Sequence, residues 1–369
     1  MPGQGGEVRD TVPPLPAWDI DVKTYESHPR VQHFIEIFTH RARSPFELSL
    51  QRQSRYGDFI RQRLRDGGLP QDLIYLALIE SWYDPHAYSK AAAVGMWQFM
   101  AGTARGMGLR VDWWVDERRD PARSTDGAVR LLSGLREQFG SLYLAAAAYD
   151  GGDGRVARGL AKNSRKMTGI EGEDRFFALA KTKDLRLETR DYVPKLIAAA
   201  LVGKEPAKYG LSVDSVPPWA FDTVRVGGST PLAAIATAAG TNVSAISVLN
   251  PHVLRGVTPP AESLWVRVPI GATEGFTERW AELDSAARTG LTSVVSKKGE
   301  TMTSVAKRHG VTAKQLGWYN PKVSRLKSGA LATGQRLLVP SAAVAAAALD
   351  VPNPSIERYP RRRAVRAKP

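Results

Sequence analysis

The amino-acid sequence predicts a mainly α domain up to about residue 209, followed by two small α+β repeats with the order strand, helix, helix, strand. Three observations lead to this fold class. Apolar residues recur at helical spacing over much of 31–201. Beyond residue 209 the segments are shorter and richer in Val, Thr and Gly. There the chain repeats itself at an offset of 70 residues, with an Asn-Pro pair in both copies.

The first part of the chain is expected to hold an irregular leader, residues 1–30, rich in Pro and Gly, and a helical domain, residues 31–209. Two amphipathic helices fit residues 31–64. The almost wholly apolar run 73–79 predicts a buried helix that begins near Pro70. Further helices are expected in this order: one capped by Ser124 and Thr125, one over 142–149 that ends at Gly151-Gly152, and one over 189–201 that is interrupted near Pro194.

The repeats are placed at 221–270 and 292–340, with a linker at 271–291 and an Ala-rich and then basic tail at 341–369. Equivalent positions share their chemistry: Val224, Ile235-Ala236, Gly240 and Asn250-Pro251 fall on Val294, Val305-Ala306, Gly310 and Asn320-Pro321. Each copy closes on a strand-like segment that ends in proline, at residue 269 or residue 340. We therefore expect two copies of one βααβ unit.

Composition restricts the classes of protein. The 369 residues contain no cysteine, which removes disulfides, cysteine metal sites and a lipid-modified N-terminal Cys. No run of about 18 apolar residues predicts a transmembrane helix, and the N-terminus lacks the order of a secretory signal. The net charge of +14 and a basic C-terminal end, with Arg361, Arg362 and Arg363, suggest attraction to a polyanion, an acidic wall polymer or an anionic membrane surface.

Three separate segments of the helical domain hold candidate residues for catalysis and ligand binding. Glu80 ends the apolar run, where low dielectric raises a carboxyl pKa and keeps the group protonated, as a general acid requires. The run 95–100, Gly-Met-Trp-Gln-Phe-Met, is expected to line a groove, in which Gln98 offers both a donor and an acceptor. Tyr149 stands just before the glycine break at 151–152, where a chain can approach a ligand closely.

Several motifs in this order resemble the lytic transglycosylases, in particular the membrane-bound murein transglycosylase D group. They are Leu69-Pro70, Ile79-Glu80-Ser81, Ala92 to Met100, Asp116-Glu117-Arg118-Arg119-Asp120-Pro121, Ala148-Tyr149-Asp150-Gly151-Gly152 and Glu188-Thr189-Arg190-Asp191-Tyr192-Val193. The resemblance covers roughly residues 48–201 and implies a lysozyme-like catalytic domain. One departure is Asp150, where the family usually has Asn. The repeats resemble wall-binding LysM modules, of which the second is the better match and the first is degenerate.

The resemblance implies the chemistry and the residues that carry it out. Glu80 would act as the catalytic acid and then as the base, in cleavage of the β-1,4 bond between N-acetylmuramic acid and N-acetylglucosamine. The C6 hydroxyl would close a 1,6-anhydro ring, so that water, metal ion and cofactor are not needed. The expected substrate-binding residues are Ser81, Ser89, Met96, Gln98, Tyr149 and Tyr192.

Other functions remain alternatives at this point. A hydrolysing muramidase would need a second carboxylate, for which Asp84 and Asp150 are the candidates. A non-catalytic peptidoglycan-binding protein and a polyanion or nucleic-acid binder are the others, although no nucleic-acid-binding motif supports the last. Peptidoglycan glycan strands are the expected partner, and the substrate places the protein in the periplasm or cell envelope.

Overall fold

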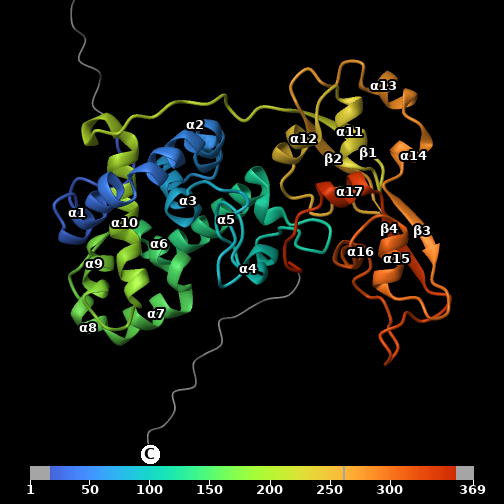
Figure 1. The fold of residues 1–369 in the computed structure, drawn as a ribbon. Coiled ribbons are helices and arrows are strands. Elements are labelled where there is room, and N and C mark those ends of the chain that lie inside the picture. The colour runs from blue at the N-terminus through green and yellow to red at the C-terminus, as the bar shows by residue number, and fades with distance from the viewer. Residues whose placement is uncertain (1–16, 261, 355–369) are drawn as a thin grey trace, which may run out of the picture. The chain divides into compact units, whose positions relative to one another are not determined.

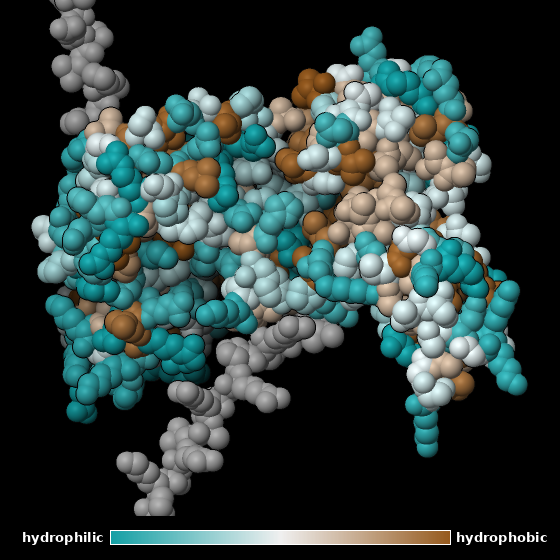
Figure 2. Space-filling model, in the orientation of Figure 1, coloured by the Kyte–Doolittle hydropathy of each residue, from teal (hydrophilic) through white to brown (hydrophobic). Residues whose placement is uncertain are grey.

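The computed structural model describes residues 17–260 and 262–354 (Figure 1). Their contacts form two compact units. The first contains the described residues up to Gln51, then Leu64–Ile79 and Leu132–Ser215. The second contains Arg52–Arg63, Glu80–Leu131 and the described residues from Val216 onward. Hydrophilic residues cover much of the surface seen in Figure 2, and hydrophobic residues lie among them in small groups.

The first unit is helical. Its elements are α1 (Pro29–Glu36), a π-helical turn (Ile37–Arg41), both ends of α2 (Arg43–Asp66), a 3₁₀ turn (Gln71–Leu73), α3 (Ile74–Ser81) without its last two residues, the end of α5 (Pro121–Phe139), α6 (Leu142–Gly151), α7 (Asp153–Lys162), α8 (Ser164–Met167), α9 (Asp174–Ala180), α10 (Leu187–Lys204) and a 3₁₀ turn (Pro206–Tyr209). The predicted mainly α domain is thus confirmed.

Helix α10 is the centre of the first unit, because α1 and α6 pack against it and its residues 196–202 are buried throughout. Gly203 lies against the ring of Tyr75, where a Cβ atom would approach Cε1 to 2.5 Å. The expected interruption at Pro194 is wrong, since α10 continues through it. Proline removes one backbone hydrogen bond, and burial of the helix on several sides holds the two halves together.

The second unit contains the middle of α2, the last two residues of α3, α4 (Ala101–Gly106), a 3₁₀ turn (Glu117–Arg119) and the rest of α5. Helix α5 begins at Pro121 and not at the predicted cap Ser124-Thr125. The Asp120 carboxylate accepts from the amides of Ala122 and Arg123, and so acts as the N-cap before a proline at the first helical position.

The two repeats fold as predicted, each with one antiparallel pair of strands beside two helices. The first has β1 (Asp222–Val226), α11 (Leu232–Ala238), α12 (Val243–Leu249) and β2 (Leu264–Val268). The second has β3 (Leu291–Val295), α15 (Met302–Arg308), α16 (Ala313–Tyr319) and β4 (Arg336–Pro340).

The asparagine that occurs in both repeats makes the same hydrogen bonds in each module. Asn320 donates from Nδ2 to the carbonyls of Leu316 and Leu338 at 2.8 and 2.7 Å, and its Oδ1 accepts from the Leu338 amide. Asn250 makes the equivalent bonds to Ile246 and Arg267. In both modules this side chain joins the end of the second helix to the closing strand, which only an amide with both donor and acceptor can do.

Three stretches differ from expectation. Within the supposed leader, Ile20, Val22 and Tyr25 are buried, and Tyr25 stacks on Phe177. The supposed linker 271–291 holds α13 (Phe276–Glu282) and α14 (Ser285–Arg288), and Phe276 belongs to the core of the first module. The supposed tail begins with α17 (Ala342–Ala347). In these stretches single apolar residues pack into the structure. They do not form a long periodic pattern that the sequence would reveal.

Residues 355–369, which include the basic end of the tail, lie outside the described residues. Among the residues that are described, no single helix has the length and hydropathy of a membrane span. Helices α11 and α12 reach those values only when taken together, and they are bent by 109° relative to each other.

Candidate active site

Glu80 lies at the C-terminal end of α3, one residue before the helix ends. The preceding turn is apolar and inaccessible, with Leu76, Ala77 and Leu78 all 0% exposed, whereas Glu80 itself is half-buried. Its carboxyl group is thus carried by a helix that the core fixes in place, and part of its surface still reaches solvent. This combination suits a proton donor that must meet a substrate.

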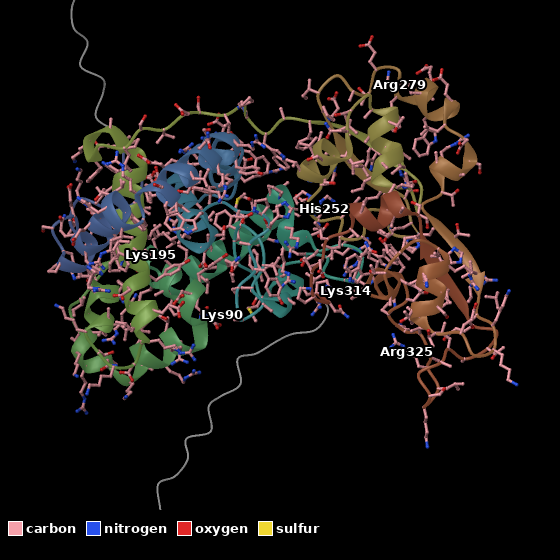
Figure 3. The ribbon with its side chains drawn as sticks, viewed as in Figure 1. Lys90, Lys195, His252, Arg279, Lys314 and Arg325 are labelled. Carbon is pink, nitrogen blue, oxygen red and sulfur yellow. The ribbon has the colours of Figure 1, made fainter. Side chains whose placement is uncertain are left out.

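Lys195, on α10, closes the same end of α3. Its ammonium donates to the carbonyl of Ile79 at 2.9 Å, which satisfies one of the carbonyls left unpaired at a helix C-terminus. Figure 3 labels Lys195 among the side chains of α10. This position follows Pro194 and carries no signal of its own in the sequence, so sequence reasoning missed it.

The turn after α3 is held by unusual backbone and by side chains of α2. Trp82 and Tyr83 adopt positive φ angles of 58° and 56°, which non-glycine residues rarely do. Gln53 donates to the Tyr83 hydroxyl at 3.1 Å, and Arg52 donates to the Trp82 carbonyl at 3.2 Å. The chain therefore reverses sharply directly behind Glu80, and such strain persists only where its surroundings impose it.

Ser81 ties this turn to the loop that follows. Its hydroxyl donates to the carbonyl of Met96 at 2.7 Å and accepts from the amide of Asp84 at 3.2 Å, and only 7% of the residue is exposed. The residue that follows Glu80 is thus bonded to the 95–100 run. The observed contacts of Ser81 are with the protein.

The loop 87–99 is a tight structure built on glycine. Gly95 has a φ of 81°, and a Cβ atom on it would meet the Arg118 carbonyl oxygen at 1.8 Å. Gln98, also at positive φ, is half-buried and donates to the Gly95 carbonyl at 2.8 Å. Ser89 accepts from the Ala93 amide at 3.0 Å through its hydroxyl. Gln98 and Ser89 are partly exposed and accessible to a ligand.

Met96 does not line a groove. It is 0% exposed, as is Trp97, whose indole N–H donates to the Thr125 hydroxyl at 3.0 Å. A run of large apolar residues predicts burial and surface grooves equally well, because both need apolar side chains. In this structure Met96 and Trp97 are the core beneath the loop.

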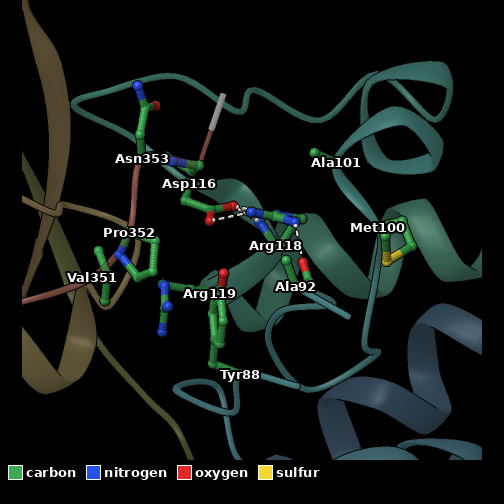
Figure 4. A pocket seen from close by; sticks show the side chains of 11 residues that line it. Tyr88, Ala92, Met100, Ala101, Asp116, Arg118, Arg119, Val351, Pro352 and Asn353 are labelled. Atoms are coloured by element: carbon green, nitrogen blue, oxygen red, sulfur yellow. Dashed lines mark hydrogen bonds and ion pairs between the residues drawn. The ribbon is translucent and has the colours of Figure 1, made fainter. Parts of the chain in front are cut away.

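Side chains of the 116–120 motif hold the 87–99 loop by hydrogen bonds. Arg118 and Asp116 form a bidentate pair at 2.8 Å in which neither side chain is more than 3% exposed. The same guanidinium donates to the carbonyl of Ala92 at 3.2 Å (Figure 4). It also donates to the carbonyl of Phe99 at 3.2 Å. Arg119 donates to the carbonyl of His86 at 3.1 Å. A buried ion pair with its remaining donors satisfied fixes the loop geometry.

The motif also joins the loop to the first βααβ module. Arg267, on β2, donates to both oxygens of Asp120, at 2.7 and 2.9 Å, and the His252 ring nitrogen Nδ1 lies 3.1 Å from the same carboxylate. Arg255 is 0% exposed, and its guanidinium stacks on Trp113 and donates to the Trp113 carbonyl.

Asp120 and His252 change each other's pKa values. Burial raises the pKa of Asp120, but His252, Arg267 and the N-cap hydrogen bonds outweigh it, so the pKa lies below its ordinary value. Burial lowers the pKa of His252 despite the opposing charge of Asp120.

The remaining candidates lie in the first unit. Tyr149 and Asp150 end α6, both half-buried, and Tyr192 on α10 is 6% exposed. Gly151 leaves no room for a Cβ atom, which would meet the Thr189 hydroxyl at 2.7 Å. Burial raises the pKa of Asp150, an effect that Thr189 and the charge of a nearby lysine oppose.

The described residues contain no group of three His, Cys, Asp or Glu that could hold a metal ion. The residues that sequence reasoning missed are positioning residues: Lys195, and the Asp116–Arg118 pair, whose motif was noted without a role.

The matches to known protein families fall on the helical region and on the two βααβ modules. Residues 58–170 match the model of the transglycosylase SLT domain, residues 220–285 that of the LysM-like domain of the lytic transglycosylase MltD, and residues 297–340 that of the LysM domain. The second match extends the first module through α13, in agreement with the packing of Phe276.

Membrane-bound lytic murein transglycosylase D of Escherichia coli strain K12 is 30% identical over 296 residues, which are 77% of this chain and 63% of that protein. Peptidoglycan transglycosylase gp16 of Escherichia phage T7 is 37% identical over 106 residues, 28% of this chain and 8% of that protein. The 70 kDa soluble lytic transglycosylase of Escherichia coli aligns over 41% of this chain and 24% of its own, with 24% identity and a TM-score of 0.34.

The three domain matches show that the chain holds a transglycosylase SLT domain, followed by an MltD-type LysM-like domain and a LysM domain, and it spans 63% of the length of its D-type relative.

Proposed function

We propose that this protein is a peptidoglycan lytic transglycosylase, which cleaves the β-1,4 bond between N-acetylmuramic acid and N-acetylglucosamine and forms 1,6-anhydromuramyl products. The observation that carries the proposal is the placement of Glu80, a half-buried residue near the end of a helix whose other residues are buried. The SLT match and the D-type relative support the substrate class. The substrate places the protein in the cell envelope.

In the proposed reaction Glu80 works first as acid and then as base. Its carboxylic proton passes to the glycosidic oxygen while the bond from that oxygen to C1 of N-acetylmuramic acid breaks, which leaves an oxocarbenium-like or oxazolinium centre. The Glu80 carboxylate then takes the proton of the C6 hydroxyl, and the C6 oxygen bonds to C1. Atoms and charge balance without water, and Glu80 returns to its protonated form.

The structure supports separate tasks for the neighbouring residues. Ser81, through its bond to the Met96 carbonyl, positions Glu80 against the 87–99 loop. Gln98 and Ser89 are accessible on that loop for sugar hydroxyl or amide groups. Tyr149 and Tyr192 are proposed to contact the substrate from α6 and α10.

A hydrolytic muramidase is the alternative, with Asp84 or Asp150 as second carboxylate. Asp84 has a structural partner, since its carboxylate accepts from the His86 amide at 2.8 Å within a turn. A residue engaged in this way can be replaced by Asn, which preserves the acceptor oxygen and removes the charge.

The products of digestion decide between the two reactions. We expect purified peptidoglycan to give muropeptides lighter by one water than hydrolysis products, as measured by mass spectrometry. Glu80→Gln should abolish them, because the amide has the shape of the acid and no transferable proton. Asp84→Asn is the matched control and should retain them. Products with free reducing ends, or full activity of the Gln variant, would refute the proposal.

A further inference from the structure

An aromatic groove of about 440 Å³ lies on the first module, outside the candidate active site. It is lined by residues 223–227 of β1 and the following glycine, by Trp265 of β2, by Thr273 and by residues of α13. Strand β1 pairs only with β2 among the described strands. The volume falls within the range of roughly 300–1,000 Å³ typical of small-molecule sites.

Three aromatic rings line the groove. Trp265, on β2, is 62% exposed, which is uncommon for so large an apolar side chain. Phe276 and Trp280 lie one helical turn apart on α13, and their rings are parallel within 10° with centroids 6.0 Å apart. Phe276 is 9% exposed and belongs to the core, so it fixes the helix face that presents Trp280.

Polar groups accompany the rings. Arg225 lies directly opposite Trp265 in the strand register, and its guanidinium makes no hydrogen bond or ion pair with any residue that the structure describes. Thr223 and Thr277 also line this groove, and the indole N–H groups of both tryptophans have no partner within the described parts of the chain. The groove thus combines flat apolar faces with several donors that are free to bind a ligand.

The second module lacks this arrangement. By strand register, Val295 takes the place of Arg225 and Arg336 takes the place of Trp265. The helix α13, which also lines the groove, follows β2, and the short α17 that follows β4 carries only Ala and Val (Figure 1). The groove is therefore a property of the first module and not of the repeated βααβ unit.

We propose that this groove binds an N-acetylated glycan strand that carries carboxylate groups. A pyranose ring has apolar C–H faces, which stack on indole rings, and hydroxyl and amide edges, which need donors and acceptors around the rings. Arg225 would pair with a carboxylate of the strand. The first module would then hold substrate through α13 and β1 while the catalytic domain acts on it.

The inference rests on the proposed function for its choice of ligand, and its failure can be told apart from failure of that function. Cleavage to anhydro products without binding at this groove would refute the glycan site alone. Binding at the groove without cleavage would refute the transglycosylase alone.

The test follows the tryptophans themselves. The full chain, in the Glu80→Gln background, is labelled with 5-fluorotryptophan, and fluorine NMR resolves its nine tryptophans. Trp265→Phe and Trp280→Phe assign the two signals of the groove. Three probes are titrated separately: a neutral N-acetylglucosamine tetramer, a muropeptide disaccharide and a free stem peptide.

We expect saturable shifts of both signals with the two saccharides. The muropeptide should bind more tightly than the neutral tetramer, and Arg225→Ala should remove this difference in affinity. Trp265→Ala should weaken the binding seen at Trp280 by about two- to ten-fold. Arg336→Ala, at the position of the second module that corresponds to Trp265, should leave the affinity measured at Trp280 unchanged. Absence of shifts, shifts with the peptide alone, or unchanged affinity in Trp265→Ala would overturn the proposal.

Discussion

Replacing Arg267 by Ala should destabilise the second unit far more than a typical surface substitution. The side chain of Arg267 is 13% exposed and that of Asp120 is 2% exposed, so removal of Arg267 leaves a buried carboxylate without its main counter-charge. Breaking a buried pair in this way costs about 3–5 kcal/mol. The two N-cap amides of α5 continue to bind Asp120, which reduces the expected cost to about 2–4 kcal/mol.

The assay is thermal unfolding of the full chain, with the second unit followed by hydrogen exchange at the amides of β1 and β2. We expect the midpoint of that unit to fall by roughly 5–10 °C. Arg123→Ala is the matched control, because Arg123 pairs with Glu117 at the surface and such pairs contribute about 0–1 kcal/mol.

A second background isolates the charge. In Asp120→Asn the buried group is neutral, so the additional loss caused by Arg267→Ala should shrink to about 1 kcal/mol. Equal effects of Arg267→Ala and Arg123→Ala, or an undiminished effect in the Asn background, would refute the reasoning.

Two further predictions concern pH and the repeated asparagine. Burial lowers the pKa of His252, so the unfolded chain binds the proton more readily and stability should fall as pH drops below about 6.5. His252→Asn should reduce this dependence of stability on pH, measured by denaturant titrations between pH 7 and 5. Part of the dependence should remain, because burial also lowers the pKa values of His28 and His86. An unchanged dependence in the variant would contradict the role of His252. Asn320→Ala removes three hydrogen bonds and should cost the second module about 1–3 kcal/mol, visible as faster hydrogen exchange at the Leu338 amide, whereas unchanged protection there would show that the asparagine does not join helix to strand.

Much of the candidate site could be predicted from the sequence because its signals are local. The apolar run before Glu80 specifies a buried helix, and the glycines at 95 and 151 mark positions where the structure has no space for a side chain. The motif order then indicated which segments form the site. Such signals depend on neighbours in the chain, which periodicity and residue type reveal.

The roles of individual side chains were harder to predict. Met96 was expected in a groove and is inaccessible, while Ser81 bonds to the protein itself. Both groove and core require apolar residues, and a hydroxyl gives no indication of its partner in the sequence. Lys195 reaches the Ile79 carbonyl across 116 residues of chain, a distance at which sequence pattern carries no information.

The sequence by itself determined the mainly α domain, the two βααβ modules and the position of the acid at the end of an apolar helix, because each follows from local periodicity, repetition and residue type. Only the tertiary structure decided which charges are buried together and which aromatic faces stay open. Asp120 binds Arg267 across 147 residues of chain, and Trp265 of β2 is exposed in the groove that residues of β1 and α13 also line. Burial and pairing are properties of surfaces that only folding brings into contact.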